Sequence, residues 1–156
     1  PTDATIPIAS VTDFDPQGGD GEHPEAVQNV IDDDPLTFWP TEGYDAGFEG
    51  AGKSGVGIVL GTGDSVTASQ LTLQTNGGGW KFNVYGSDAK EAPVDPPFLA
   101  DGSETGAWGD PLAADQSAAK STTVDLTPTP SRWQLIWLTD LNGVPAAEIN
   151  GAQLSS

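Results

Sequence analysis

The chain has 156 residues, which is enough for one domain with a sizeable core and short for two. It carries 23 acidic and 5 basic residues, and the resulting formal charge of -18 disfavours nucleic acid and anionic membrane surfaces as partners through long-range repulsion. The absence of cysteine excludes disulfides, thiolate metal sites and a cysteine nucleophile, while five Trp and five Phe argue against a disordered chain.

The N-terminal part is expected to contain a linker end, one strand and one short helix. Residues 1–7 hold two prolines and no periodicity, so we interpret them as a linker end and 8–156 as a single domain. The run 8–14 predicts the first strand. A proline at its start and apolar residues at helical spacing predict a short helix over 24–31.

An acidic turn, Asp32 to Asp34, follows this predicted helix and leads through Pro35 and Thr37 to Trp39. Neighbouring carboxylates repel one another unless a cation lies between them, and hard oxygen donors of this kind suit calcium. Taken alone, however, an acidic triplet is more often a solvated turn. Calcium site and solvated turn therefore both stay open at this point.

From residue 55 onward the sequence predicts strands separated by turns rich in glycine and proline. The expected strands are 56–60, 66–75, 80–86, 121–126, 132–138 and 146–154. Trp80, Phe82 and Val84 alternate with more polar residues, as in a strand with one buried face. The run 132–138 is apolar on both faces and is expected at the centre of a sheet. Many short strands with almost no helix predict an all-β antiparallel sandwich of the jelly-roll type.

Loops carry the candidate ligand contacts. Sugars are held by aromatic rings that stack on their apolar faces and by polar groups that bind their hydroxyls. The aromatic candidates on loops are Tyr44, Phe48 and Trp108, although such residues are more often caps over the edge of a sandwich. Lys53 lies in the same long loop as Tyr44 and is a candidate to pair with an anionic glycan or with a neighbouring Glu.

Recognisable catalytic signatures are missing from the sequence. The one histidine, His23, precedes a proline in an expected loop, and neither a nucleophile triad nor a phosphate-binding glycine signature can be built. Paired carboxylates carry no signal among 23 acidic residues. We therefore expect that the chain is not an enzyme, and a hydrolase would require a cleft lined by paired acids.

The chain resembles the discoidin-like, galactose-binding-like β-sandwich family over nearly its whole length. The resemblance rests on Phe14-Asp15-Pro16, 21–25, 32–39, Tyr44, 55–60, 133–141 and 147–149. More narrowly, the chain resembles the extracytoplasmic C-terminal domain of actinobacterial MviN-type lipid II flippases and of certain membrane-anchored Ser/Thr protein kinases. These motifs are moderately specific, because an Asp-Gly-Asp-Pro-x-Thr-x-Trp pattern also marks many carbohydrate-binding modules.

The resemblance implies a structural calcium ion at the turn that leads into the Trp-bearing strand. The implied ligands are Asp32, Asp34, Thr37 and Glu148, completed by the carbonyl oxygens of Asn29 and Ala147. About six oxygens from both ends of the domain form a chemically sensible calcium shell. Asp33 stands where the family has glycine, and the flippase-type domains need not keep the metal, so a turn held by hydrogen bonds is the alternative.

The resemblance also implies a function and a location. It implies a non-catalytic, extracytoplasmic binding module of a larger membrane protein that recognises cell-wall glycan, peptidoglycan or its lipid-linked precursor. The alternative is a monomeric spacer or protein interaction domain in the cell-envelope machinery, without a sugar ligand. The sequence contains neither a membrane span nor a signal peptide, so we expect any membrane anchor to lie elsewhere in a longer protein.

Overall fold

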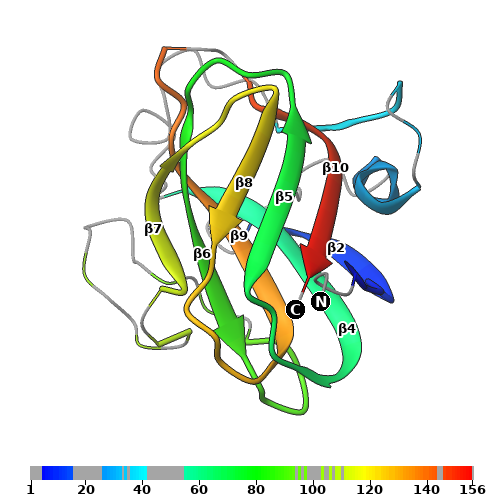
Figure 1. The fold of residues 1–156 in the computed structure, drawn as a ribbon. Coiled ribbons are helices and arrows are strands. Elements are labelled where there is room, and N and C mark those ends of the chain that lie inside the picture. Colours follow the sequence, from blue (N-terminus) through cyan, green and yellow to red (C-terminus); the bar gives the residue numbers. More distant parts are fainter. Residues whose placement is uncertain are drawn as a thin grey trace.

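The computed structural model describes residues 5–15, 26–32, 34, 36–41, 55–93, 95, 97, 103, 106, 108–109, 111–143 and 146–155. Regular structure in these residues is almost entirely β, in two antiparallel sheets that pack face to face (Figure 1). This arrangement confirms the predicted all-β antiparallel sandwich. No helix in the described part of the chain is long and apolar enough to cross a membrane.

The first sheet, here called the β10 sheet, has the strand order β1-β10-β5-β8, and β3 also pairs with β10. Its strands are β1 (Thr5–Ile6), β3 (Trp39–Pro40), β5 (Gln70–Thr75), β8 (Ser121–Asp125) and β10 (Glu148–Ser155). The two short strands β3 and β1 flank opposite ends of β10 on the same edge, so segments from the start of the chain hold its last strand.

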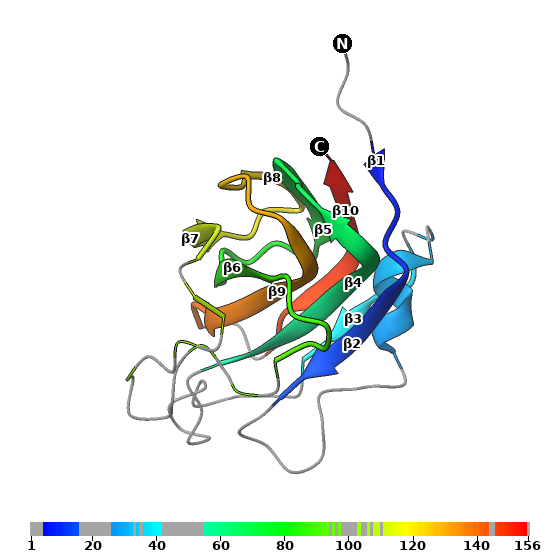
Figure 2. The same cartoon turned by 90° about the horizontal axis from the view of Figure 1, so that it is seen from below.

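The second sheet, the β9 sheet, has the order β2-β4-β9-β6-β7 and forms the other layer of the sandwich (Figure 2). Its strands are β2 (Ser10–Phe14), β4 (Val56–Val66), β6 (Lys81–Ser87), β7 (Ala113–Ser117) and β9 (Ser131–Asp140). The central place of β9 confirms the interpretation of 132–138 as a strand buried on both faces.

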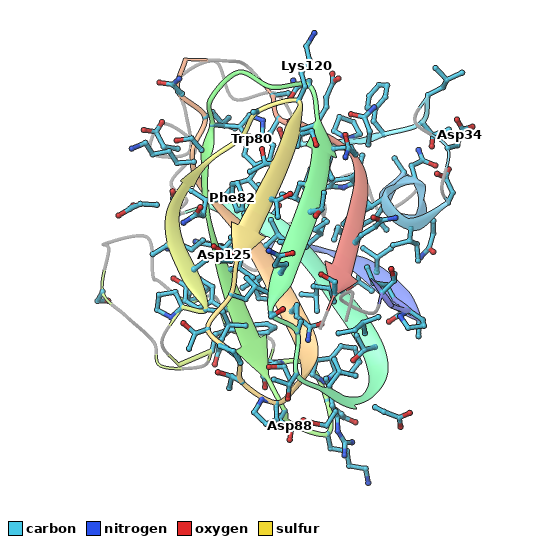
Figure 3. The ribbon with its side chains drawn as sticks, viewed as in Figure 1. Asp34, Trp80, Phe82, Asp88, Lys120 and Asp125 are labelled. Atoms are coloured by element: carbon cyan, nitrogen blue, oxygen red, sulfur yellow. The ribbon has the colours of Figure 1, made fainter. Side chains whose placement is uncertain are left out.

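The main core fills the space between the two sheets. Trp80 and Phe82 lie in this interior, with ring centroids 5.5 Å apart, and both are fully buried (Figure 3). Trp39 enters the same core from β3. The alternation read from 80–86 thus places its apolar set against the opposite sheet, as a period of two requires.

A second apolar cluster covers the outer face of the β9 sheet. Its buried members are Phe14, Val59, Tyr85, Trp108, Leu135 and Trp137, with Trp133 partly buried at its edge. The β9 sheet is therefore covered on both sides, whereas the outer face of the β10 sheet presents polar residues. Trp133, from the run 132–138 expected at the centre of a sheet, reaches this edge and donates its indole N–H to the carbonyl of Ala89.

Several elements differ from the sequence-based expectation. The predicted helix 24–31 is a short 3-10 helix, η1 (Val27–Ile31), among the described residues. Thr5–Ile6, inside the segment interpreted as linker, forms β1 against Leu154 and Ser155. Strand β7 was not predicted, because its residues are mostly exposed at a sheet edge and show no apolar alternation.

Candidate functional site

The acidic turn after η1 is closed by its own hydrogen bonds. Asp32 accepts the hydroxyl of Thr37 at 2.6 Å through Oδ2 and the backbone N–H of Asp34 at 2.9 Å through Oδ1. Asp34 in turn accepts the N–H of Leu36 at 2.9 Å. The side-chain amide of Asn29 donates to the carbonyl of Phe38 at 2.9 Å, which closes the segment against η1. The two carboxylates thus accept hydrogen bonds from nearby backbone N–H groups, as in Asx turns.

These donors affect the charge state of one carboxyl group in particular. The Thr37 hydroxyl, and next the Asp34 N–H, hold the pKa of Asp32 below its ordinary value of 3.8. Each hydrogen bond favours the ionised form, so Asp32 stays charged into mildly acidic solution.

The C-terminal residues expected beside this turn lie at the start of β10. Ala147 and Thr41 exchange two hydrogen bonds, from Ala147 N to Thr41 Oγ1 and from Thr41 N to Ala147 O. Glu148 pairs with Pro40 of β3 and is hydrogen-bonded through its backbone to Asn76. The fold therefore brings both ends of the domain together through β3, which follows directly from the acidic turn.

The donor set fits a hard cation in chemistry, since it consists of carboxylate, hydroxyl and carbonyl oxygens. Within the described residues, however, no group of three or more His, Asp or Glu side chains is arranged to hold a metal ion. A calcium ion at this turn would therefore depend on the Thr37 hydroxyl and on carbonyl oxygens as well as on Asp32 and Asp34.

Four loop residues were predicted to contact a ligand, and the structure describes one of them, Trp108. Tyr44, Phe48 and Lys53 lie outside the described residues. Trp108 is 3% exposed, packs edge-on against Phe14 at 5.8 Å and donates its indole N–H to the carbonyl of Asp95 at 3.0 Å. Trp108 is thus a cap over the outer cluster, and its buried ring offers no face for a sugar to stack on.

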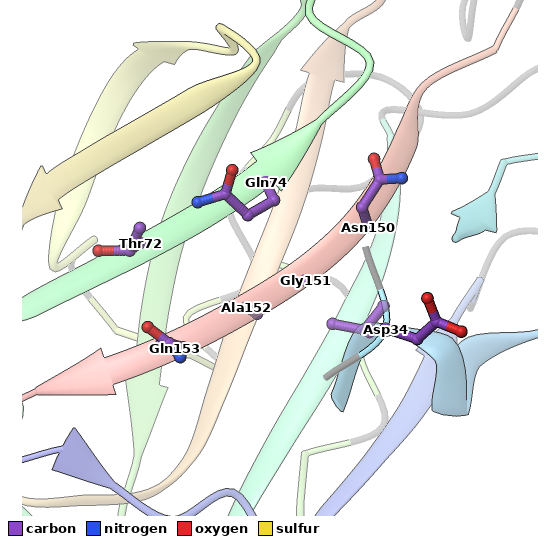
Figure 4. Close-up of a pocket in the computed structure, with 8 residues that line it drawn as sticks. Asp34, Thr72, Gln74, Asn150, Gly151, Ala152 and Gln153 are labelled. Carbon is purple, nitrogen blue, oxygen red and sulfur yellow. The ribbon is translucent and has the colours of Figure 1, made fainter. Parts of the chain in front are cut away.

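A cleft of about 180 Å³ opens on the outer face of the β10 sheet, next to η1. Thr72 and Gln74 of β5 and Gly151 and Gln153 of β10 form its floor, where Thr72 pairs with Gln153 and Gln74 with Gly151 (Figure 4). Asp34 lines the cleft from the acidic turn, and its carboxylate points away from these floor residues. The remaining lining residues are Val30, Asn150 and Ala152.

The floor of the cleft is polar but uncharged. The amide of Gln74 makes a long contact of 3.3 Å to Ser121, and the hydroxyls of Thr72 and Thr123 lie 3.4 Å apart. Such weak lateral contacts leave donor and acceptor positions for a ligand. Asp34 is the one ionisable side chain among the residues that line the cleft.

Gly151 gives this cleft its depth. A methyl group added there would lie 3.8 Å from Gln74 Cγ and 4.0 Å from the carbonyl oxygen of Val30, so it would point into the open space between them. A glycine inside a strand weakens the strand and often marks a place where a ligand approaches the backbone closely. Alternate polar residues in β5 and this glycine in β10 are the sequence signal by which the cleft could have been predicted.

A second hollow of about 300 Å³ adjoins the first along the edge of β10. It is lined by Thr5, Ile6, Pro7, Ile8, Ile31, Ala152 and Gln153. Gln153 and Ala152 line both hollows, so the two are neighbours across β10. The surface of the second hollow is mixed, because Ile6, Ile8 and Ile31 contribute apolar side chains while polar atoms contribute as much of the lining as apolar ones.

Comparison with known proteins gives a fold relationship. No protein-family model matches the chain, and no curated protein sequence matches it. Among solved structures, the family 32 carbohydrate-binding module of AlyQ in complex with 4,5-unsaturated mannuronic acid is 18% identical, with a TM-score of 0.63 over 97% of each chain. A pectin-binding carbohydrate-binding module is 17% identical, with a TM-score of 0.65 over 97% of this chain and 93% of that one.

A family 32 module of NanJ from C. perfringens, solved with galactose, is 16% identical, with a TM-score of 0.63 over 99% of this chain and 100% of that one. The chain also spans 34% of the length of a truncated AlyQ that carries a module of this family and an alginate lyase domain. At such identities the similarity establishes a shared β-sandwich fold. It does not carry a ligand from one protein to another, because function lies in the site.

Proposed function

We propose that this domain is a non-catalytic sugar-binding module and that the cleft over Gly151 is its binding site. The observation that carries the proposal is a cleft floor of amide and hydroxyl side chains above a strand glycine. Amides and hydroxyls can each donate and accept, which matches the alternating hydroxyl groups of a sugar. The shared fold with several carbohydrate-binding modules supports the same conclusion.

The number of carboxyl groups that line the cleft supports a role in sugar binding without hydrolysis. Glycoside hydrolysis commonly uses two carboxyl groups on opposite sides of the scissile bond. Of the residues that line the cleft, Asp34 alone carries a carboxylate. One carboxylate at the rim can orient a sugar hydroxyl but does not supply an acid and a base together.

We further propose that the ligand belongs to the cell envelope, as peptidoglycan or a related wall glycan, outside the cell membrane. The sequence resemblance to extracytoplasmic domains of lipid II flippases supports this choice. Soluble muropeptides are accordingly the first ligands to test, beside a panel of common oligosaccharides.

Calorimetric titration of the domain with muropeptides and oligosaccharides tests the proposed function. We expect at least one saccharide to bind and the Gly151→Val variant to lose that binding, because its side chain fills the cleft floor. Thr12→Val is a control, since it changes an exposed residue on β2 of the β9 sheet, away from the cleft, and should bind normally. If no saccharide binds the wild type, the sugar-binding proposal fails and the spacer alternative gains support.

We also propose that calcium binds at the acidic turn, which forms one wall of the cleft through Asp34. The ligands would be Asp32, Asp34 and Thr37 with nearby carbonyl oxygens, in line with their donor chemistry. The expected ligand Glu148 does not join the two aspartates in a group that could hold a metal ion. A metal that binds the folded state alone raises the melting temperature by mass action. At a calcium concentration about 100 times Kd, the stabilisation is about 2.7 kcal/mol.

Thermal melts with calcium and with chelator test this site. Asp32→Ala should abolish the difference between the two conditions, while Asp125→Ala, at a carboxylate on β8 away from the turn, should preserve it. Equal melting of the wild type with and without calcium would rule the metal out.

A further inference from the structure

We propose that the ligand of this site is an extended glycan chain that lies across β10 and fills both hollows with uncharged sugar units. The inference rests on the proposed function and narrows it to a class of sugar and a mode of binding. It follows from three features: the connection of the two hollows, the mixture of polar and apolar groups that lines them, and the distribution of charge.

The two hollows form one track across the strand. The cleft reaches to Thr72 and Gln74 of β5, and the second hollow reaches to Thr5 and Ile6 on the far side of β10. Gln153 lies at the junction and lines both. Neighbouring strands are about 4.8 Å apart, so the track from β5 over β10 to β1 is about 10 Å wide. This span exceeds a single sugar ring and suits consecutive units of a chain.

The track offers both polar groups and apolar side chains, which suits the hydroxyl groups and the C–H faces of sugar units. Amides and a hydroxyl on the β5 side can bind ring hydroxyls. Ile6, Ile8 and Ile31 on the β1 side offer apolar surface for the C–H faces of a ring or for an acetamido methyl group. Aliphatic side chains would here replace the aromatic platform that the buried Trp108 does not provide.

Charge selects against acidic sugars at this track. The residues that line the two hollows include one anion, Asp34, and no Lys or Arg. A uronate in the track would therefore meet no cationic side chain there, and in chelator, which keeps calcium from the acidic turn, the whole molecule repels it with a formal charge of -18. The neighbours in fold that were solved with mannuronate or named for pectin binding thus do not indicate the ligand class of this chain.

The test compares oligosaccharides that differ in length and in charge. Calorimetry would use units of glucose, galactose and N-acetylglucosamine from monomer to tetramer, and tetramers of galacturonate and mannuronate. We expect a neutral tetramer to bind at least about tenfold more tightly than its monomer and than either uronate tetramer, which corresponds to about 1.4 kcal/mol. Raising the salt concentration from about 20 mM to about 500 mM should reduce the difference in affinity between the neutral tetramer and the uronate tetramers, because salt screens the repulsion.

Substitutions of residues in the track test whether the ligand binds there. Gly151→Val should abolish binding of all lengths, with Gly151→Ala as the smaller change if the valine perturbs folding. Gln153→Ala, at the junction, should reduce tetramer affinity about tenfold and monomer affinity less, which converts to about 1.4 kcal/mol for the tetramer. Thr12→Val, at an exposed position on β2 of the β9 sheet, should leave every affinity unchanged.

The outcomes separate this inference from the function on which it rests. Binding of a uronate tetramer as tight as that of the best neutral tetramer would overturn the inference on charge, and equal affinity of monomer and tetramer would overturn the extended track. Either result would still support sugar binding. Failure of every saccharide to bind would overturn the proposed function itself.

Discussion

Trp108 lies in a loop, yet its ring is 3% exposed. It packs against Phe14 and lies in the same outer cluster as Trp137. The indole N–H finds an acceptor in the carbonyl of Asp95, which satisfies a donor that would otherwise be buried without a partner. At the scale of the residue, this tryptophan anchors the loop to the β9 sheet.

Trp108→Ala should therefore lower the free energy of unfolding by about 3 kcal/mol, because it removes a large buried side chain. Trp108→Phe should cost less, about 1 kcal/mol for the lost hydrogen bond together with a smaller loss of packing. Urea unfolding of both variants measures these costs. A Trp108→Ala variant of normal stability that had lost sugar binding would contradict the role as a cap.

The turn at Asp32 predicts a pH dependence of stability. Because hydrogen bonds lower its pKa in the fold, ionised Asp32 stabilises the folded state. This stabilisation is complete above the ordinary value of 3.8 and disappears as the pH falls below it, through the lower pKa of the folded state.

Thr37→Val removes the strongest of these donors, so wild type and variant should differ in stability at pH 5 and converge toward about pH 2. Unfolding curves at several pH values measure this difference, with Thr123→Val as a control for loss of a hydroxyl that does not contact a carboxylate. Parallel curves for wild type and Thr37→Val over the whole range would show that Asp32 does not depend on Thr37.

Strand β4 shows how an element can require glycine for packing. It is buried over its first half, with Ile58 and Leu60 in the main core and Val59 in the outer cluster. A methyl group at Gly57 would overlap with the carbonyl oxygen of Ile136 on β9. The close approach of these two central strands therefore depends on the absence of a side chain at this position.

Gly57→Ala should destabilise the domain by about 1–3 kcal/mol, since the backbone of β9 must shift. Gly151→Ala is the matched substitution in β10, where the added methyl group makes only ordinary contacts. It should be neutral or stabilising by up to about 1 kcal/mol. Chemical denaturation of the two variants compares them directly, and similar stabilities would contradict the close approach of β4 and β9.

At the scale of the whole molecule, net charge opposes the compact state. Acidic residues outnumber basic ones by 23 to 5. Arg132 and Asp88 lie 3.8 Å apart, but both are partly exposed, and such pairs contribute little to stability. Self-repulsion of the unbalanced acidic groups therefore acts against the packing of the two cores.

Adding NaCl at neutral pH should raise the melting temperature, because salt screens this repulsion. The rise should be about 2–4 °C for each 1 kcal/mol of stabilisation. Melts near the sequence pI of about 4.1 provide the control, since the charges nearly balance there and salt should have little effect. A melting temperature that falls with salt at neutral pH would contradict net repulsion.

The sequence alone determined the fold class and the main strands. Apolar alternation over 80–86 and the doubly apolar run 132–138 depend on local periods that a buried sheet imposes, so they can be read without coordinates. The acidic turn was equally visible, because Asp, Thr and Pro have short-range preferences. Strand β7 and the pairing of Thr5–Ile6 with β10 could not be predicted from the sequence. Both lie at sheet edges, and an edge strand forms because a partner strand from a distant part of the chain lies beside it.

Tertiary structure alone decided which residues meet at a site. Trp108 and Tyr85 became buried because the outer face of the β9 sheet is covered, and nothing local to their sequence states this. Gln74 and Gly151 lie 77 positions apart in the chain and become neighbours through the register of β5 and β10. A cleft depends on such long-range register and on the open space that a glycine leaves because it has no side chain. Local sequence patterns encode neither, because they report the preferences of a segment and not its partners in space.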